Sequence, residues 1–112
     1  MNHIRLPHHR LHAFGVAVEL LGAVRAAKVR DATLRDHAMR SAKSACMLAA
    51  EGAGRVSTAD KARVFGIARG EAGEAAAAVE VAVAAGDANA AALPDVLVLA
   101  DRFVAMMTRL IR

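Results

Sequence analysis

A cluster of histidines near the start of the chain is the first group of side chains that could bind a metal ion. His8 and His12 are four residues apart, so on one helix their imidazoles could share a zinc ion, and His9 lies between them. A third ligand is not obvious apart from His3. The alternative is an ordinary cluster of surface histidines, which we favour, and we predict no metal site.

Two carboxylates later in the chain, Glu71 and Glu74, are spaced to lie on one face of a helix and could also ligate a metal. Ferritin-like helical bundles use a Glu-x-x-His motif for such sites, and this chain has none. We therefore expect Glu71 and Glu74 to be solvated or ion-paired.

Three further side chains are expected to be structural rather than catalytic. Glu51 falls at the carboxyl end of a predicted helix, where a negative charge is unfavourable, so it should have a partner: a nearby arginine or the amides that open the next helix. Cys46 is the only cysteine and lies among small apolar residues, so it should be buried and inert. His37 stands alone in its helix. Because no nucleophile–base pair, phosphate-cradling loop or complete metal set is visible, we predict a non-enzyme without a cofactor.

Basic residues are concentrated between positions 25 and 43, whereas positions 70 to 100 contain no Lys or Arg. A basic surface could contact the phosphates of RNA or DNA, because phosphate binding depends more on charge than on shape. It could equally be a solvated face, or meet the acidic surface of another subunit. Without Trp or Tyr to stack bases, sequence-specific reading of single strands is not expected. The candidate nucleic-acid-binding residues are Arg25, Lys28, Arg30, Arg35, Arg40 and Lys43.

Four helices are predicted to carry these residues, over 7–29, 32–51, 58–85 and 94–111 of a single domain, 1–112. Apolar residues recur every three or four positions, and an alanine-rich composition with only three Phe favours close-packed helices over strands. Short connections should make successive helices antiparallel, which predicts an all-α, up-down four-helix bundle. No apolar run is long enough to span a membrane.

Glycine and capping residues define the predicted helix ends. Pro7 suits a first helical position. Gly52 and Gly54 fall in a predicted turn, where a glycine backbone can take positive φ. Ser57 is the predicted N-cap of the third helix, with Asp60 three residues later as a weak capping box.

The third predicted helix has features that indicate self-association. Each of Gly66, Gly70 and Gly73 lowers helix stability by about 1 kcal/mol relative to Ala. Their presence despite this cost indicates close backbone approach, within the bundle or between subunits. Between positions 75 and 85 only Glu80 is polar. A helix that is apolar on nearly every side should be buried on nearly every side, which one four-helix bundle cannot achieve. We therefore predict a homo-oligomer.

A long motif covers residues 40–74. Its members are Arg40, Ser44, Ala50, Glu51, Gly52, Gly54, Arg55, Ser57, Asp60, Lys61, Arg63, Ile67, Ala68, Arg69, Gly70 and Glu74. The motif resembles the small bacterial four-helix-bundle proteins known as 23S rRNA intervening-sequence proteins, whose pattern is approximately R-A-x-x-S-I-x-x-N-I-A-E-G-x-G-R-x-S-x-x-D-K-x-R-F-x-x-I-A-R-G-S-x-x-E. The spacing matches without a gap, and the last helix resembles the C-terminal helix of that family.

This resemblance implies a cytoplasmic bundle that assembles as a ring of five, a homopentamer. Related proteins include the accessory subunit of diversity-generating retroelements, a basic pentamer that binds nucleic acid and a reverse transcriptase. Three positions depart from the family pattern: Leu48 replaces Asn, Ala45 replaces Ile, and Glu71 replaces Ser. A family site that used the Asn and Ser side chains is not expected to transfer to this chain.

The predicted function is a non-catalytic, oligomeric helical-bundle scaffold that binds a protein or nucleic-acid partner. The alternative is a basic accessory protein that binds RNA or DNA through the hairpin of the first two helices, with a reverse transcriptase or rRNA as partner.

Overall fold

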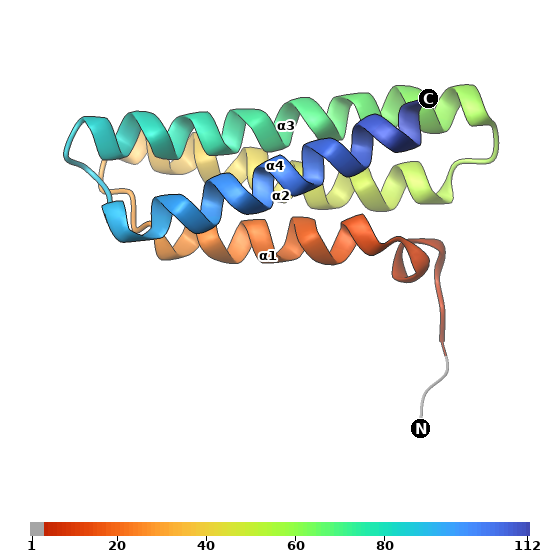
Figure 1. The fold of residues 1–112 in the computed structure, drawn as a ribbon, viewed down its shortest axis with the longest axis horizontal. Coiled ribbons are helices and arrows are strands. Elements are labelled where there is room, and N and C mark those ends of the chain that lie inside the picture. The colour runs from red at the N-terminus through yellow and green to blue at the C-terminus, as the bar shows by residue number, and fades with distance from the viewer. Residues whose placement is uncertain (1–3) are drawn as a thin grey trace.

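The fold consists of long helices joined by short connections (Figure 1). The computed structural model describes residues 4–112, and within that range it contains no β-strand. The elements are η1 (Pro7–Arg10), α1 (His12–Ala26), α2 (Ala32–Gly54), α3 (Thr58–Ala84), η2 (Ala90–Ala92) and α4 (Leu93–Ile111). The prediction of an all-α chain with four helices is confirmed.

Each helix packs against the next one in the chain, and α4 packs back against α1. Figure 1 shows that successive helices run in opposite directions, with the α1–α2 and α3–α4 connections at the same end of the bundle. The arrangement is that of an up-down bundle. It brings the α2–α3 turn and the end of α4 together at the opposite end.

Helix α1 is shorter than the predicted span 7–29. Leu11 has an extended backbone with φ −92° and ψ 107°, so the turn that starts at Pro7 is a separate 3-10 element and α1 begins at His12. At its other end α1 stops at Ala26, and Lys28 adopts a left-handed φ of 48°. A residue at positive φ cannot continue a right-handed helix, so the chain reverses there.

Helix α2 runs beyond the predicted span 32–51 and ends at Gly54. The expectation of positive φ at Gly52 or Gly54 is wrong, because in residues 4–112 the glycine with positive φ is Gly86, at 76°. The chain leaves α2 through the extended backbone of Arg55, with φ −71° and ψ 150°. The predicted bounds of the third and fourth helices agree with α3 and α4 to within one residue.

Large side chains of α1, α3 and α4 and many alanines of α2 and α3 fill the interior. Leu20, Phe103 and Met107 are fully buried. The buried alanines of α2 and α3 include Ala38, Ala42, Ala45, Ala49, Ala68, Ala72, Ala75 and Ala82. Small side chains at these positions allow the two helix axes to approach closely.

Backbone hydrogen bonds join the two connections at one end of the bundle. The backbone N–H of Arg30 donates to the carbonyl of Asp87 at 2.8 Å, and that of Asn89 donates to the carbonyl of Ala27 at 2.7 Å. The α1–α2 hairpin is therefore tied to the α3–α4 connection.

Within residues 4–112, one side of α3 is not covered by other parts of the chain. A Cβ atom placed on Gly70 or Gly73 would meet nothing within 4 Å, and one on Gly66 would only reach Ile111 Cδ1 at 4.0 Å. Val81 on the same side is 54% exposed. Close backbone approach within the bundle therefore does not explain the glycines of this helix.

Candidate functional site

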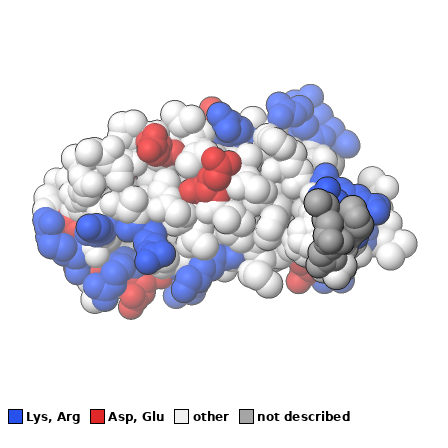
Figure 2. Space-filling view, turned by 90° about the horizontal axis from the view of Figure 1, so that it is seen from below, with Lys and Arg blue, Asp and Glu red and all other residues white. Residues whose placement is uncertain are grey.

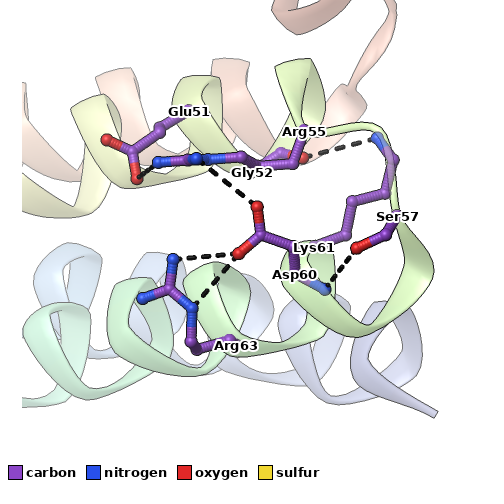
Figure 3. Close-up of polar contacts among 7 residues, drawn as sticks. All are labelled: Glu51, Gly52, Arg55, Ser57, Asp60, Lys61 and Arg63. Atoms are coloured by element: carbon purple, nitrogen blue, oxygen red, sulfur yellow. Dashed lines mark hydrogen bonds and ion pairs between the residues drawn. The ribbon is translucent and has the colours of Figure 1, made fainter.

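Ser57 and Lys61 complete the turn between α2 and α3 (Figure 3). The Ser57 hydroxyl accepts a hydrogen bond from the backbone N–H of Asp60 at 3.1 Å, which confirms the predicted N-cap. Lys61 Nζ donates to the carbonyl of Ala53 at 2.9 Å and to that of Gly52 at 3.4 Å. A side chain of α3 thus binds carbonyl groups at the end of α2, of which that of Gly52 also accepts from the backbone N–H of Arg55.

Four charged motif residues form a chain of ion pairs across the same turn (Figure 3). The Arg55 guanidinium donates to Glu51 Oε2 at 3.0 Å and lies 3.4 Å from Asp60 Oδ2. Asp60 Oδ1 in turn accepts from Arg63 Nε at 3.2 Å and from its NH2 group at 2.9 Å. The hydrogen bond that Arg55 donates to Glu51 and the negative charge of Asp60 raise the pKa of Arg55 above its ordinary value.

The partner expected for Glu51 is therefore Arg55. The carboxylate of Asp60 pairs with two arginines rather than closing a reciprocal capping box with Ser57. These charged groups are partly exposed, and solvent and salt screen such pairs, so the chain of ion pairs orients the turn more than it stabilises the fold.

Phe65 of α3 explains the glycine at position 52. A Cβ atom on Gly52 would lie 2.6 Å from Phe65 Cε1 and 2.7 Å from Cδ1, and both residues are buried. Only a residue without a side chain fits there. A Cβ on Gly54 would meet nothing within 4 Å, so no contact in the described part of the chain, 4–112, explains that glycine.

The last residues of the motif join α3 to the helices on either side of it. Arg69 Nε donates to the hydroxyl of Thr108 on α4 at 2.9 Å. Glu74 is exposed, and its Oε2 atom lies 3.5 Å from Nε2 of His37 on α2. These two motif residues therefore link α3 to both of its neighbouring helices through exposed contacts.

The N-terminal histidines do not share one helix, so the expected i, i+4 placement of His8 and His12 is wrong. His8 belongs to η1 and His12 to α1, because the extended residue between the two elements interrupts the helix. The ring of His8 packs on His9 at 4.1 Å and edge-on against Phe14 at 4.8 Å between ring centroids. His3 lies outside the described residues.

Cys46 is buried as predicted, and burial raises the pKa of its thiol. Within residues 4–112, no group of three or more His, Cys, Asp or Glu residues is placed to hold a metal ion.

The six candidate nucleic-acid-binding residues differ in how they are engaged. The side chain of Arg30 donates to the carbonyl of Gly86 at the end of α3, and Arg35 lies 3.6 Å from Asp36. The other members of the set make no ion pair or side-chain hydrogen bond within residues 4–112; they are Arg25, Lys28, Arg40 and Lys43. All six are exposed. In Figure 2, Lys and Arg side chains gather at the lower left, at the end of the bundle where α1 leads into α2.

Two apolar features beside these cations were missed by sequence reasoning. The first is a recess between the end of α1 and the start of α2, which we call the hairpin recess; it is lined by Val24, Arg25, Lys28, Val29, Arg35, Ala38 and Met39. The second is the α2 outer face, formed by Asp36, Met39, Arg40, Lys43, Ser44, Met47 and Leu48. The sequence signal was the pair Met39 and Met47, eight residues apart among basic residues.

Comparisons with known proteins agree with the motif. The family model described as 23S rRNA-intervening sequence protein matches residues 11–109. No curated protein matches the chain significantly. In the described range of 4–112, every helix is too short or too polar to cross a lipid bilayer.

Proposed function

The chain belongs to the 23S rRNA-intervening sequence protein family, and we propose that it is a non-catalytic scaffold that self-associates through one side of α3. The proposed assembly is a homopentameric ring, as the family resemblance implies. A chain whose only cysteine is a buried free thiol fits a reducing cytoplasm, where the proposal places the assembly.

The observation that carries this proposal is the uncovered side of α3, here called the α3 outer face. Its residues are Gly66, Gly70, Gly73, Ala77, Val81 and Ala84, all of them exposed. None is charged, and each glycine costs about 1 kcal/mol of helix stability relative to Ala. Within residues 4–112, no contact uses the absent side chains of Gly70 and Gly73, which supports close approach of a helix from a second copy.

Light scattering coupled to size exclusion, together with native mass spectrometry, tests the self-association. We expect an oligomer at micromolar concentration, and dissociation of that oligomer by Val81→Glu, which places a charge on the α3 outer face. The matched control is Ala90→Glu, on the exposed connection between α3 and α4, which should leave the mass unchanged. A wild-type protein that is monomeric at these concentrations would overturn the proposal.

A second candidate function is RNA or DNA binding, and the unpaired cations near the hairpin favour it. Four of these cations, Arg25, Lys28, Arg40 and Lys43, have no competing partner within residues 4–112. If all four contact phosphates of duplex DNA, the logarithm of the binding constant should fall against the logarithm of salt with a slope of roughly −3 to −4.

Random-sequence RNA and DNA titrations across a salt series provide the test of this candidate. The variant Arg25→Gln/Lys28→Gln should flatten the slope, whereas Arg102→Gln/Arg109→Gln removes the same charge from exposed positions on α4 and should not. Absence of binding at low salt, or a slope near zero, would remove the nucleic-acid candidate.

A further inference from the structure

The hairpin recess combines an apolar floor with a basic rim. Val24, Val29 and Ala38 are all buried, so the floor presents hydrocarbon. Arg25 and Lys28 line the same recess and are exposed. An apolar side chain inserted into this recess would lose contact with water, while a carboxylate next to it in sequence would meet a cation. Recesses that anchor one side chain in this way are typical centres of protein–protein interfaces.

The α2 outer face extends the same combination along the helix. Met39 lines both the hairpin recess and the α2 outer face, which makes the two surfaces continuous. Met47 is 69% exposed, and Arg40 and Lys43 lie between the two methionines in the sequence. From Arg35 to Leu48 the helix rises about 20 Å, which matches a partner helix of about three to four turns.

From this arrangement we infer that the hairpin recess and the α2 outer face bind an acidic amphipathic helix of a partner protein. The apolar stripe of that helix would lie on the methionines, whose flexible side chains adapt to varied partners. Its flanking carboxylates would meet the unpaired cations, which favours acidic partners over basic ones. The inference rests on the proposed scaffold function and names the class of partner, on a surface separate from α3.

Two other occupants fit the surface less well. The phosphates of RNA or DNA would use the cations but not the exposed thioether of Met47. In the described part of the chain, neither the hairpin recess nor the α2 outer face is lined by an aromatic ring on which a base could stack. The α3 outer face of a second copy is built from Gly, Ala and Val, with Glu74 and Glu80 only at its margins. It therefore offers fewer carboxylates to Arg40 and Lys43 than an acidic helix would.

Fluorescence anisotropy with a designed peptide tests the inference on the full chain. The probe is a fluorescein-labelled 16-residue peptide with Leu at helical i, i+3, i+4 and i+7 positions and Glu on the flanks, and its control is a scrambled peptide of the same composition. We expect the amphipathic peptide to bind at least about tenfold more tightly than the scrambled one. The double variants Met39→Gln/Met47→Gln and Arg25→Gln/Lys28→Gln should each weaken binding about tenfold.

Arg102→Gln/Arg109→Gln removes equal charge from α4 and should change the affinity by less than about twofold. Because Met39 also packs against the core, a variant with lowered thermal stability is replaced by Met47→Gln alone, whose side chain is largely exposed. Weaker binding by Met47→Gln with an unchanged melting curve supports the inference.

Equal binding of the scrambled peptide would show attraction by net charge alone and overturn the inference. The inference would also be overturned if the protein bound duplex RNA or DNA but not the peptide, and if that binding depended on Arg25 and Lys28 but not on Met47. Loss of self-association in Met47→Gln, again without peptide binding, would show that a second copy covers this face. A monomeric wild-type protein that still binds the amphipathic peptide would support the inference and remove the proposed self-association. Failure of the partner-helix inference can therefore be distinguished from failure of the proposed scaffold function.

Discussion

Replacing Gly52 by alanine should destabilise the protein, although alanine is the better helix former. Gly52 lies inside α2 without positive φ, so Gly52→Ala alone would gain up to about 1 kcal/mol of helix propensity. The added Cβ would lie 2.6 Å from Phe65 Cε1, which is 0.8 Å closer than the 3.4 Å lower limit of ordinary contact. Phe65 is only 3% exposed, so its ring has little room to move away.

Overpacking a filled interior costs typically about 1–3 kcal/mol, so the net loss for Gly52→Ala should be about 1 kcal/mol and at most about 2 kcal/mol. The measurement is urea denaturation followed by far-ultraviolet circular dichroism, because the chain has no Trp or Tyr for fluorescence. Protein concentration must be held constant, since self-association would shift the apparent stability.

Gly22→Ala on α1 is the matched control. A Cβ at that exposed helical position meets nothing within 4 Å, so this variant should gain about 1 kcal/mol or less. Combining Gly52→Ala with Phe65→Leu should relieve the overlap, giving a favourable coupling of about 1 kcal/mol in a double-mutant cycle. If Gly52→Ala were as stabilising as Gly22→Ala, the packing explanation for the motif glycine would be refuted.

Four other outcomes are expected from the contacts and the burial described. Ser57→Ala removes the oxygen that accepts from the N–H of Asp60 and should cost about 1 kcal/mol in the same denaturation experiment; no change would mean that the cap is not needed. Arg30→Gln removes the contact with the Gly86 carbonyl and should cost about 0.5–1.5 kcal/mol by the same measurement, whereas an unchanged midpoint would show that water replaces it. The thiol of Cys46 should react with a disulfide reagent at pH 8 at least about tenfold more slowly in the folded than in the unfolded protein, and equal rates would contradict its burial. Because burial raises the pKa of Cys46 from 9.0, its contribution to stability should be fully present below that pH and lost at higher pH, as the unfolded state ionises first.

Local signals predicted most of the helices and their caps. The spacing of apolar residues located all four helices, and the N-cap at Ser57 followed from its own side chain and the amide three residues later. The first helix was predicted too long because its apolar pattern continues through Leu11, although the backbone there is extended. A periodic pattern identifies the face of a helix better than it identifies the ends.

The charged residues of the motif were likewise predicted only in part from the sequence. The helix dipole indicated that Glu51 needs a partner. Only the folded turn showed that Arg55 is that partner and that it also pairs with Asp60. The basic cluster could be counted from the sequence, whereas the engagement of Arg30 with Gly86, which lies 56 residues away, could not.

The sequence by itself determined what depends on neighbours within a few positions: the helices, their caps and the family motif. Only the tertiary structure decided that Gly52 faces the ring of Phe65, that α3 leaves one side uncovered, and that Val24 and Met39 form one recess beneath a rim of cations. The physical reason is range. Helix propensity and capping act over one or two turns, whereas steric fit and the pairing of charges depend on which helix lies alongside, and packing of the whole chain sets that arrangement.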